Sequence, residues 1–463
     1  MAEKLIISGG GLVGSLAAIV FKKRGYDVEI FEKRSDLRLN YEGGRSINLI
    51  ITSRGLNALK MAGVVEQVLP ITVKVTGRMM HAKSGEIKFQ PYGKDDNECN
   101  YSVSRSELNG LLLDLAQKLQ IPIHFEQEVQ KVSFDEKTCT VRDLKTQKET
   151  NYKFDRLVGT DGAGSPTRKC VIQHVGETAS DRVDFLESDY KEMFMPAGEN
   201  KQYPLDPKGL HIWPRGTHML MALPNLGGSF TMTLYMPKTG GQWSFENINS
   251  PEKVKDLFQS EFPDAIPLMP KYIDDYMNNP QGVLGTVRCH PWHVGDSVFL
   301  AGDAAHAIVP FFGQGMNCGF EDISTLVEIL DQCGNNWGEA LQIYSQNQKK
   351  NADAIADMAI ENFVEMKDKV GDAQFLFRKM VDGLLEKEFS DIYRTRYAMV
   401  TYTLVPYSIT QQAGLIQNKI LDQLCDGKSE LSQIDLKEAR NLLEKDFMPF
   451  LNKNKVKLET FTL

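Results

Sequence analysis

A glycine-rich segment near the start of the chain constrains the fold more than any other feature. Gly9, Gly11 and Gly14 form a Gly-x-Gly-x-x-Gly motif directly after the apolar run Leu5-Ile6-Ile7, so we expect a strand, a tight turn and a helix. The first glycine permits the turn, the second lets the backbone approach a pyrophosphate, and the third lets the helix pack on the strand. The helix start then offers free N–H groups and a positive dipole end to the phosphates. The motif predicts a dinucleotide-binding unit.

An acidic residue follows at the position that such a unit requires. Val28-Glu29-Ile30-Phe31-Glu32 predicts a second strand, and Glu32 ends it, 21 residues after Gly11. A carboxylate here binds ribose hydroxyl groups, and it would repel a 2′-phosphate. The site therefore fits FAD or NAD better than NADP. The competing interpretation is a glycine-rich turn without a ligand, which would not require the strand, the helix and Glu32 together.

A second segment, Gly302-Asp303-Ala304-Ala305-His306, follows an expected buried strand at Ser297–Ala301. Asp303 is suited to accept hydrogen bonds from a ribityl chain. The loop Pro310–Asn317 then leads into a helix that should start near Asn317, and backbone N–H groups there could stabilise negative charge on a reduced flavin. One end of a flavin dinucleotide needs the first motif and the other end needs this one, so the pair points to FAD. A third segment, Asp161-Gly162 with Ser165 and Arg168, is uninformative alone.

The pattern along the chain predicts an α/β protein with interleaved parts. A Rossmann-like FAD-binding domain of the glutathione-reductase type is expected in three pieces, at 1–75, 100–180 and 290–340. It includes a helix at Ser104–Leu119 with a capping box of Ser104 and Glu107. An antiparallel-sheet substrate domain is expected at 76–99 and 181–289, and a helical C-terminal cap at 341–463. Interleaving of this kind favours a ligand pocket at the domain interface.

Composition excludes several classes of function. The 463 residues carry a net charge of -8 with no basic block, so a nucleic-acid partner is not expected. We find no apolar stretch near 18 residues and no room for a secretory signal before the first strand, so no transmembrane anchor is expected. The 7 cysteines are scattered, which favours free thiols in a cytoplasmic protein. The histidines form no metal-binding motif, so no metal site is expected. A monomer or homodimer is expected. The polar segment Asn452–Lys457 is expected to be a solvated tail.

The three segments in this order resemble the class A flavoprotein monooxygenases, in which the Asp-Gly segment lies near the flavin and the transient NADPH path. Further segments, from about residue 5 to about residue 407, resemble the kynurenine 3-monooxygenase family more narrowly. These segments are Gly44–Leu49, Gln90–Gly93, Leu210–Pro214, Ala222–Asn225, Val309–Asn317, Glu361–Met366 and Arg396–Thr401. Membrane-bound members of that family have a C-terminal anchor, which is not apparent here. The last 50 or so residues match nothing that we can assign.

The resemblance implies hydroxylation of L-kynurenine to 3-hydroxy-L-kynurenine with FAD bound, NADPH as transient co-substrate and O2, through a flavin 4a-hydroperoxide, in tryptophan catabolism and the biosynthesis of NAD or quinolinate. No side chain is expected to be an obligatory acid or base, and Phe311 and Gln314 would shape the reaction space. The preference for NADPH over NADH comes from the family alone. The helical region would close over the pocket.

The resemblance also assigns residues. Arg78 would grip the substrate carboxylate, three polar residues would donate further hydrogen bonds, Glu365 would join that network or accept from the ammonium group, and apolar residues would wall the ring. The expected substrate-binding residues are Arg78, Tyr92, Asn362, Glu365, Tyr397, Leu210, Met219, Met221 and Phe311. The expected FAD-binding residues, motif residues included, are Gly9, Gly11, Val13, Gly14, Phe31, Glu32, Lys33, Arg34, Arg45, Ile50, Arg105, Val129, Asp161, Asp303, Pro310, Gly313, Gly315, Met316 and Asn317.

Three alternatives compete. A related hydroxylase acting on a phenol or quinolone would have no use for an amino-acid clamp of Arg78 and Asn362. A flavin-dependent reductase or epoxidase acting on lipids would favour an apolar, membrane-attached surface. A non-enzymatic protein that uses the FAD fold as a scaffold would not need intact flavin motifs, and here the motifs are intact.

Overall fold

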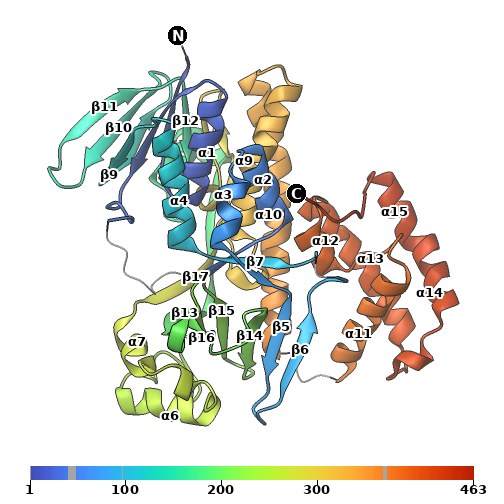
Figure 1. Ribbon diagram of the computed structural model, residues 1–463. Helices are drawn as coiled ribbons and strands as arrows, with labels where there is room; N and C mark the ends of the chain where they lie inside the picture. The colour runs from blue at the N-terminus through green and yellow to red at the C-terminus, as the bar shows by residue number, and fades with distance from the viewer. Residues whose placement is uncertain (1, 40–47, 96, 369–372) are drawn as a thin grey trace. The chain divides into compact units, whose positions relative to one another are not determined.

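The computed structural model describes residues 2–39, 48–95, 97–368 and 373–463 (Figure 1). The chain divides into two compact units. The first comprises residues 1–72, 102–186 and 283–353, and the second comprises residues 73–101, 187–282 and 354–463. The second unit thus contains most of the expected sheet region and most of the expected helical region. Three segments of each unit alternate along the chain.

The first unit is built on a six-stranded sheet. Its strand order is β18 (His293–Val294), β19 (Val298–Leu300), β12 (Arg156–Gly159), β1 (Lys4–Ser8), β2 (Asp27–Glu32) and β8 (Ile123–Phe125). All neighbouring strands are parallel except β18 and β19. Leu5, Ile6 and Ile7 are completely buried. Parallel sheets are covered on both faces, which is why β1 is a continuous apolar run.

Helices and a small sheet complete the first unit. The expected helix at 104–119 is confirmed as α4 (Arg105–Lys118), and the hydroxyl of Ser104 accepts the backbone N–H of Glu107. The helix expected near Asn317 begins two residues earlier, as α9 (Gly315–Gln332). The other helices of this unit are α1 (Leu12–Lys23), α2 (Ser53–Met61), α3 (Val65–Val68), α5 (Pro166–Val175) and α8 (Asp303–His306). The remaining strands are β3 (Asn48–Ile51), β9 (Gln127–Ser133), β10 (Thr138–Asp143) and β11 (Glu149–Lys153), of which the last three form an antiparallel sheet.

The second unit contains most of a seven-stranded sheet. The strand order is β17 (Gln281–His290), β13 (Ser180–Met195), β16 (Phe230–Pro237), β15 (Met219–Pro224), β14 (Gly209–Pro214), β5 (Gly77–His81) and β6 (Ile87–Pro91). β17 and β13 carry the chain between the units. The short strands β4 (Val73–Val75) and β7 (Asn100–Ser104) flank the β5–β6 hairpin in sequence. Two helices, α6 (Pro251–Glu261) and α7 (Tyr272–Asn278), interrupt the region expected to be sheet, although Ser250-Pro251 is a typical helix start.

The two faces of this sheet carry different apolar clusters. Trp213, Leu220 and Met232 belong to a core that also contains Val254 and Phe258 of α6. Alternate residues point to the other face, because side chains alternate along a strand. That face carries a smaller apolar cluster of Val75, Leu210, Ile212, Met80, Tyr92, Met221 and Leu223. The first face is therefore structural, and the second is available for a site.

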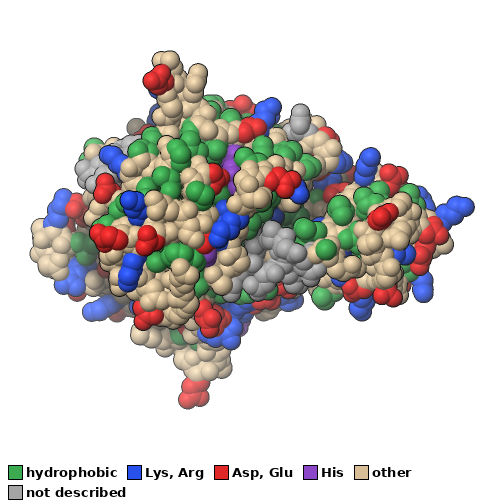
Figure 2. Space-filling view, turned by 90° about the horizontal axis from the view of Figure 1, so that it is seen from below, with side chains coloured by type: hydrophobic (Ala, Val, Ile, Leu, Met, Phe, Trp, Pro, Cys, Tyr) green, Lys and Arg blue, Asp and Glu red, His purple; other side chains and the backbone are tan. Residues whose placement is uncertain are grey.

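Helices form the rest of the second unit. Helix α10 (Trp337–Asp368) begins in the first unit and enters the second at Ala354. It is followed by α11 (Ala373–Glu388), α12 (Arg396–Tyr402), α13 (Tyr407–Cys425), α14 (Leu436–Leu442) and α15 (Met448–Lys453), with a π-helical turn between the last two. No helix in the described ranges combines the length and apolarity needed to cross a bilayer. Acidic and basic side chains are interspersed on the face in Figure 2. The expectation of a solvated tail was only partly right. Val456, the one apolar residue between Lys455 and Lys457, packs against the core of these helices.

Candidate active site

The glycine loop of the first unit has the geometry that a pyrophosphate requires. Gly9 has a φ of +102°, and a Cβ atom there would lie 2.6 Å from the carbonyl oxygen of Thr160. A Cβ atom at Gly14 would overlap the Gly9 carbonyl oxygen and lie 2.6 Å from the Thr160 hydroxyl. At Gly11, by contrast, a Cβ atom would meet nothing within 4 Å. Two glycines thus allow close packing, and the third leaves open backbone where a phosphate would approach.

Glu32 holds this loop from the end of β2. One carboxylate oxygen accepts the backbone N–H of Gly10 at 2.8 Å and the other accepts that of Arg34 at 2.8 Å. Asn109 of α4 completes the loop by donating to the Gly10 carbonyl oxygen at 3.1 Å and to the Ser15 hydroxyl at 3.3 Å. Sequence reasoning missed Asn109. Its signal was an amide within the apolar face of α4, beside Leu108.

The Asp-Gly segment is tied into the same unit. The Asp161 carboxylate accepts from the hydroxyl of Ser165 and from the N–H and hydroxyl of Thr167, the last two at 3.0 and 2.8 Å. Arg168 is buried and donates to the Ala163 carbonyl at 2.8 Å and to the Ala304 carbonyl at 2.9 Å. Arg168 therefore connects the third sequence segment to the second. The Asp161 carboxylate therefore holds the start of α5 in place through these hydrogen bonds.

Asp303 presents a carboxylate at the carboxyl end of β19. It is exposed and makes no hydrogen bond within the described part of the chain. The preceding Gly302 has a φ of +61°, and a Cβ atom there would lie 2.9 Å from the side chain of Val13. Helix α1 and the Gly-Asp segment are thus packed together, so the two motifs lie on one edge of the sheet. An open acceptor at this place fits a ribityl chain.

The loop after Asp303 is fixed from inside. The amide of Asn317 donates to the carbonyls of Ile50 at 2.7 Å and Gly313 at 2.9 Å, and accepts the N–H of Thr52 at 2.9 Å. Gln314 is wholly buried and accepts from the Thr52 hydroxyl at 3.3 Å. Both side chains therefore set the shape of the loop from within the protein. The backbone of Gly313 and Gly315 is what the loop offers to a ligand.

The remaining residues expected at FAD fall into three groups. Phe31 and Val129 are buried, and Phe31 stacks on His124 with ring centroids 4.8 Å apart. Lys33, Arg34 and Arg105 are exposed, and Arg105 begins the helix that carries Asn109. Pro310 and Met316 lie on the same loop and helix start as the glycines, with Met316 buried and Pro310 half-buried. Arg45 lies outside the described residues.

A buried ion pair lies beneath the Gly-Asp segment. His306 Nε2 lies 2.6 Å from an Asp322 carboxylate oxygen, which also accepts the Gly302 N–H at 2.7 Å. Burial alone would lower the pKa of His306, but Asp322 raises it well above its usual value. The imidazolium is therefore the stable form. Sequence reasoning missed this pair, because Asp322 lies on α9, 16 residues after His306, and no spacing motif joins the two.

In the second unit, Arg78 lies among tyrosines. Its guanidinium carbon is 5.4 Å from the ring centre of Tyr92 and 5.6 Å from that of Tyr397, and the two rings stack 5.3 Å apart. No carboxylate among the described residues forms an ion pair with Arg78, and its Nε is buried without a hydrogen-bond partner. Burial would lower the pKa of Arg78, but the tyrosines and Glu365 raise it, so the charge persists. A partly buried cation without a counter-ion is suited to bind an anion.

The tyrosines are held by their own partners. Burial raises the pKa values of Tyr92 and Tyr397, so both are neutral phenols. Asn100 donates to the Tyr397 hydroxyl at 3.1 Å. Asn100 is buried and was missed, since a single asparagine at the start of a strand carries no signal of its own. The phenol groups remain hydrogen-bond donors at physiological pH.

Asn362 and Glu365 lie one turn apart on α10. Glu365 is 3.2 Å from the Lys379 ammonium and 3.5 Å from the Arg396 guanidinium, so its carboxylate already has two cationic neighbours. It also acts electrostatically on Arg78. The structure therefore brings Arg78, Tyr92, Tyr397 and Glu365 into one electrostatic cluster.

An apolar surface adjoins Arg78. Leu210 pairs in register with Arg78 across the parallel strands β5 and β14, so both side chains leave the same face of the sheet. Met221 pairs with Ile212 on that face, and Met219 follows by alternation. Met219 is buried and Met221 is half-buried. Phe311, the remaining expected wall residue, belongs to the first unit and is buried.

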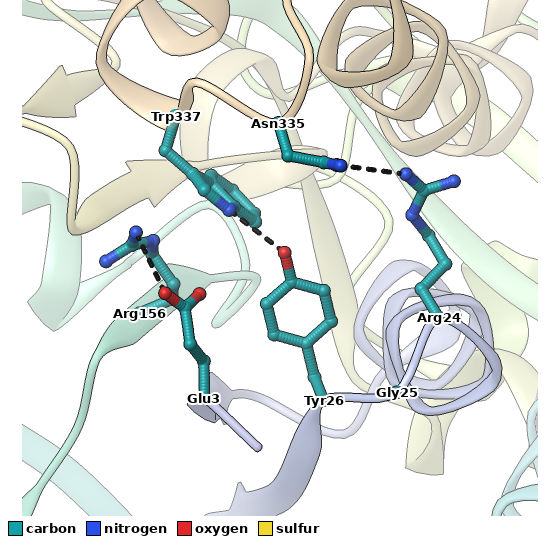
Figure 3. A pocket seen from close by; sticks show the side chains of 7 residues that line it. All are labelled: Glu3, Arg24, Gly25, Tyr26, Arg156, Asn335 and Trp337. Carbon is teal, nitrogen blue, oxygen red and sulfur yellow. Dashed lines mark hydrogen bonds and ion pairs between the residues drawn. The ribbon is translucent and has the colours of Figure 1, made fainter. Parts of the chain in front are cut away.

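A further hollow of about 550 Å³ lies at the other edge of the first unit's sheet (Figure 3). Its walls come from the residues before or at the amino ends of β1, β2 and β12, namely Glu3, Tyr26 and Arg156, and from Trp337. The Trp337 indole donates to the Tyr26 hydroxyl at 3.0 Å, and Arg156 pairs with Glu3 at 3.5 Å. The glycine loop follows the carboxyl end of β1, so this hollow is not the nucleotide site.

Comparison with known proteins agrees with this geometry. Residues 2–359 match the family described as FAD binding domain. The chain is 41% identical over 460 residues to the kynurenine 3-monooxygenase of Myxococcus xanthus, covering 98% of this chain and 97% of the relative. It is 39% identical over 465 residues to that of Dictyostelium discoideum, covering 97% and 99%.

Solved structures show the fold. The tetrameric form of 2-methyl-3-hydroxypyridine-5-carboxylic acid oxygenase matches with a TM-score of 0.65 at 20% identity, over 80% of this chain and 94% of that one. The expected fold class, an FAD-binding α/β domain with an antiparallel sheet and a helical C-terminal region, is confirmed. The protein is an FAD-dependent aromatic monooxygenase, and the chain belongs to the kynurenine 3-monooxygenase family.

Proposed function

We propose that this protein hydroxylates L-kynurenine at ring position 3, using NADPH and O2, and so acts in tryptophan catabolism toward NAD or quinolinate. The names of the two relatives support the substrate, and the relatives match nearly the whole chain. The single observation that carries the proposal is the Arg78 guanidinium, which is flanked by two phenols and has no carboxylate partner in the described part of the chain.

Each part of the substrate has a matching group in the second unit. The α-carboxylate binds the Arg78 guanidinium, and Tyr92 and Tyr397 donate further hydrogen bonds. Glu365 is the anionic side chain of the cluster, and it accepts from the ammonium group. Leu210, Met219 and Met221 bury the aromatic ring, and Asn362 contributes an amide from α10.

The chain's contribution to the chemistry is binding and positioning. FAD, when bound, supplies the redox and oxygen-transfer chemistry, and the residues to hold it are the glycine loop, Glu32, Asp303 and the loop around Gly313. Asp303 and the open backbone at Gly11 fit this cofactor. We assign no side chain as an obligatory acid or base. Phe311 shapes the loop near the flavin, and so does the buried hydrogen bond between Gln314 and Thr52.

The test measures NADPH oxidation by the purified holoenzyme with and without L-kynurenine, with mass spectrometry of the products. We expect faster oxidation and a product one oxygen heavier. Stimulated oxidation that yields only peroxide would make kynurenine an effector and not the substrate. No stimulation by L-kynurenine, together with turnover of a phenol, would overturn the proposal in favour of a related hydroxylase.

A further inference from the structure

The segment after α15 is an integrated part of the second unit. In Figure 1 it runs from α15 back to α12, and the N–H of Phe461 donates to the Tyr402 carbonyl at 2.7 Å. Val456 and Leu458 pack against the helical core, and Thr460 is the next residue in this alternation. The inward-facing side of the segment therefore ends at Thr460.

Thr460 joins a buried charge network. Arg394 and Glu98 are each 1% exposed and form an ion pair of 2.7 Å. Thr460 accepts from Arg394 Nη1 at 3.0 Å and donates to Glu98 at 2.7 Å. Glu386 lies 2.8 Å from Arg394 Nε. The Thr460 hydroxyl thus satisfies both members of a pair that has no access to water, where an unsatisfied group is costly.

This network holds the two elements that carry the tyrosines beside Arg78. Glu98 accepts the Lys94 N–H at 3.1 Å, which closes the turn that follows Tyr92. Glu98 lies two residues before Asn100, the donor to the Tyr397 hydroxyl. Arg394 lies three residues before Tyr397, just ahead of α12. The Arg394–Glu98 pair therefore fixes Tyr92 and Tyr397 relative to each other.

We propose that Thr460 is a positioning residue for the substrate clamp: through Arg394 and Glu98 it holds Tyr92 and Tyr397 around Arg78, and so sets the affinity for the amino-acid end of the substrate. This inference rests on the proposed function. Thr460 lies in the part of the sequence for which neither motif nor resemblance indicated a role.

The experiment compares Thr460→Val, which keeps the shape and removes the hydroxyl, with Thr460→Ser, which keeps the hydroxyl. Thr462→Val is the matched control, because Thr462 is exposed and makes no hydrogen bond in the described part of the chain. KM for L-kynurenine, kcat, FAD content and Tm are measured for each holoenzyme. We expect Thr460→Val to raise KM about tenfold with kcat changed by less than about twofold, and the other two variants to match the wild type.

Each other outcome has a defined meaning. An unchanged KM in Thr460→Val, with wild-type turnover of L-kynurenine in the same assay, would overturn the inference and leave the proposed function standing. A rise in KM shared equally by Thr460→Ser would also overturn it, because the effect would then follow the methyl group. If Thr460→Val does not fold, Thr460→Ser together with Arg394→Lys decides: wild-type KM in both excludes positioning by this network. A wild type inert toward L-kynurenine removes the proposed function, and this inference falls with it.

Discussion

The two units build their binding features in different ways. In the first unit the groups available to a ligand are backbone groups. They belong to an open glycine, to helix starts and to a loop that Asn317 holds from inside the protein. In the second unit the ligand is offered side chains, with Arg78, Tyr92 and Tyr397 brought together from a strand, a turn and a helix. A backbone site needs particular glycines at fixed spacing, so it leaves a motif. A side-chain site needs only that distant residues meet, so it leaves none.

The largest expected effect is a loss of FAD binding after a substitution at the most tightly packed glycine of the first unit. Gly14→Ala should abolish FAD binding, because a Cβ atom there overlaps the Gly9 carbonyl and lies 2.6 Å from the Thr160 hydroxyl. Flavin absorbance per protein after purification measures the loss. Gly11→Ala is the control: a Cβ atom there meets nothing within 4 Å, so the apoprotein should keep its Tm while FAD affinity falls. Equal flavin content in Gly14→Ala and the wild type would refute the packing argument.

The second prediction is that the stabilities of the two units depend differently on pH. Burial lowers the pKa values of His211 and His218 in the second unit to about 4. Their unfolded forms bind protons more readily, so the second unit should be fully stable above pH 6.5 and lose up to about 3 kcal/mol per histidine as pH falls toward 4. His306 in the first unit has a raised pKa, so its contribution is present below pH 6.5 and is lost as pH rises through its folded value.

Hydrogen exchange at about pH 7 and about pH 5, corrected for intrinsic rates, tests this difference. Peptides from β14 and β15 should lose protection at the lower pH before peptides from α8 and α9 do. Replacing His211 and His218 by glutamine should reduce the effect. Earlier loss of protection in α8 and α9 would contradict the assignment.

A third prediction concerns the proposed anion site. Arg78→Ala should raise KM for L-kynurenine by about one to two orders of magnitude, the loss of a charge-assisted pair worth about 2 kcal/mol. FAD content should not change, because every residue expected at FAD belongs to the first unit. Steady-state kinetics measures the first quantity and flavin absorbance the second. An unchanged KM would exclude the carboxylate role.

The smallest expected effect lies at Glu32. Glu32→Ala removes the acceptor of the Gly10 and Arg34 N–H groups and the expected ribose ligand, so FAD should be retained less well during purification. Dialysis followed by flavin quantification measures this. Glu29→Ala, on the same strand, is a control that leaves the loop contacts intact. Full retention in Glu32→Ala would argue against the ribose role.

The sequence was sufficient for what local geometry dictates. Gly9, Gly14, Glu32 and Asp303 were identified by spacing after apolar runs, and the Ser104 cap by its local pattern. It was not sufficient to predict hydrogen bonds and ion pairs between separate segments of the chain. Arg168 reaches Ala304, and Asp322 reaches His306, through contacts that no local pattern encodes. For Arg78 and the tyrosines, only the resemblance joined residues that the fold brings together.

The most direct test of the proposed site is whether Arg78 recognises the substrate carboxylate. KM and kcat are measured for L-kynurenine and for its decarboxylated analogue, kynuramine, with the wild type and with Arg78→Met. We expect the wild type to prefer L-kynurenine strongly and Arg78→Met to lose most of this preference, since neither substrate can then form the ion pair. An equal preference in both enzymes would show that another group reads the carboxylate and would contradict the proposed site.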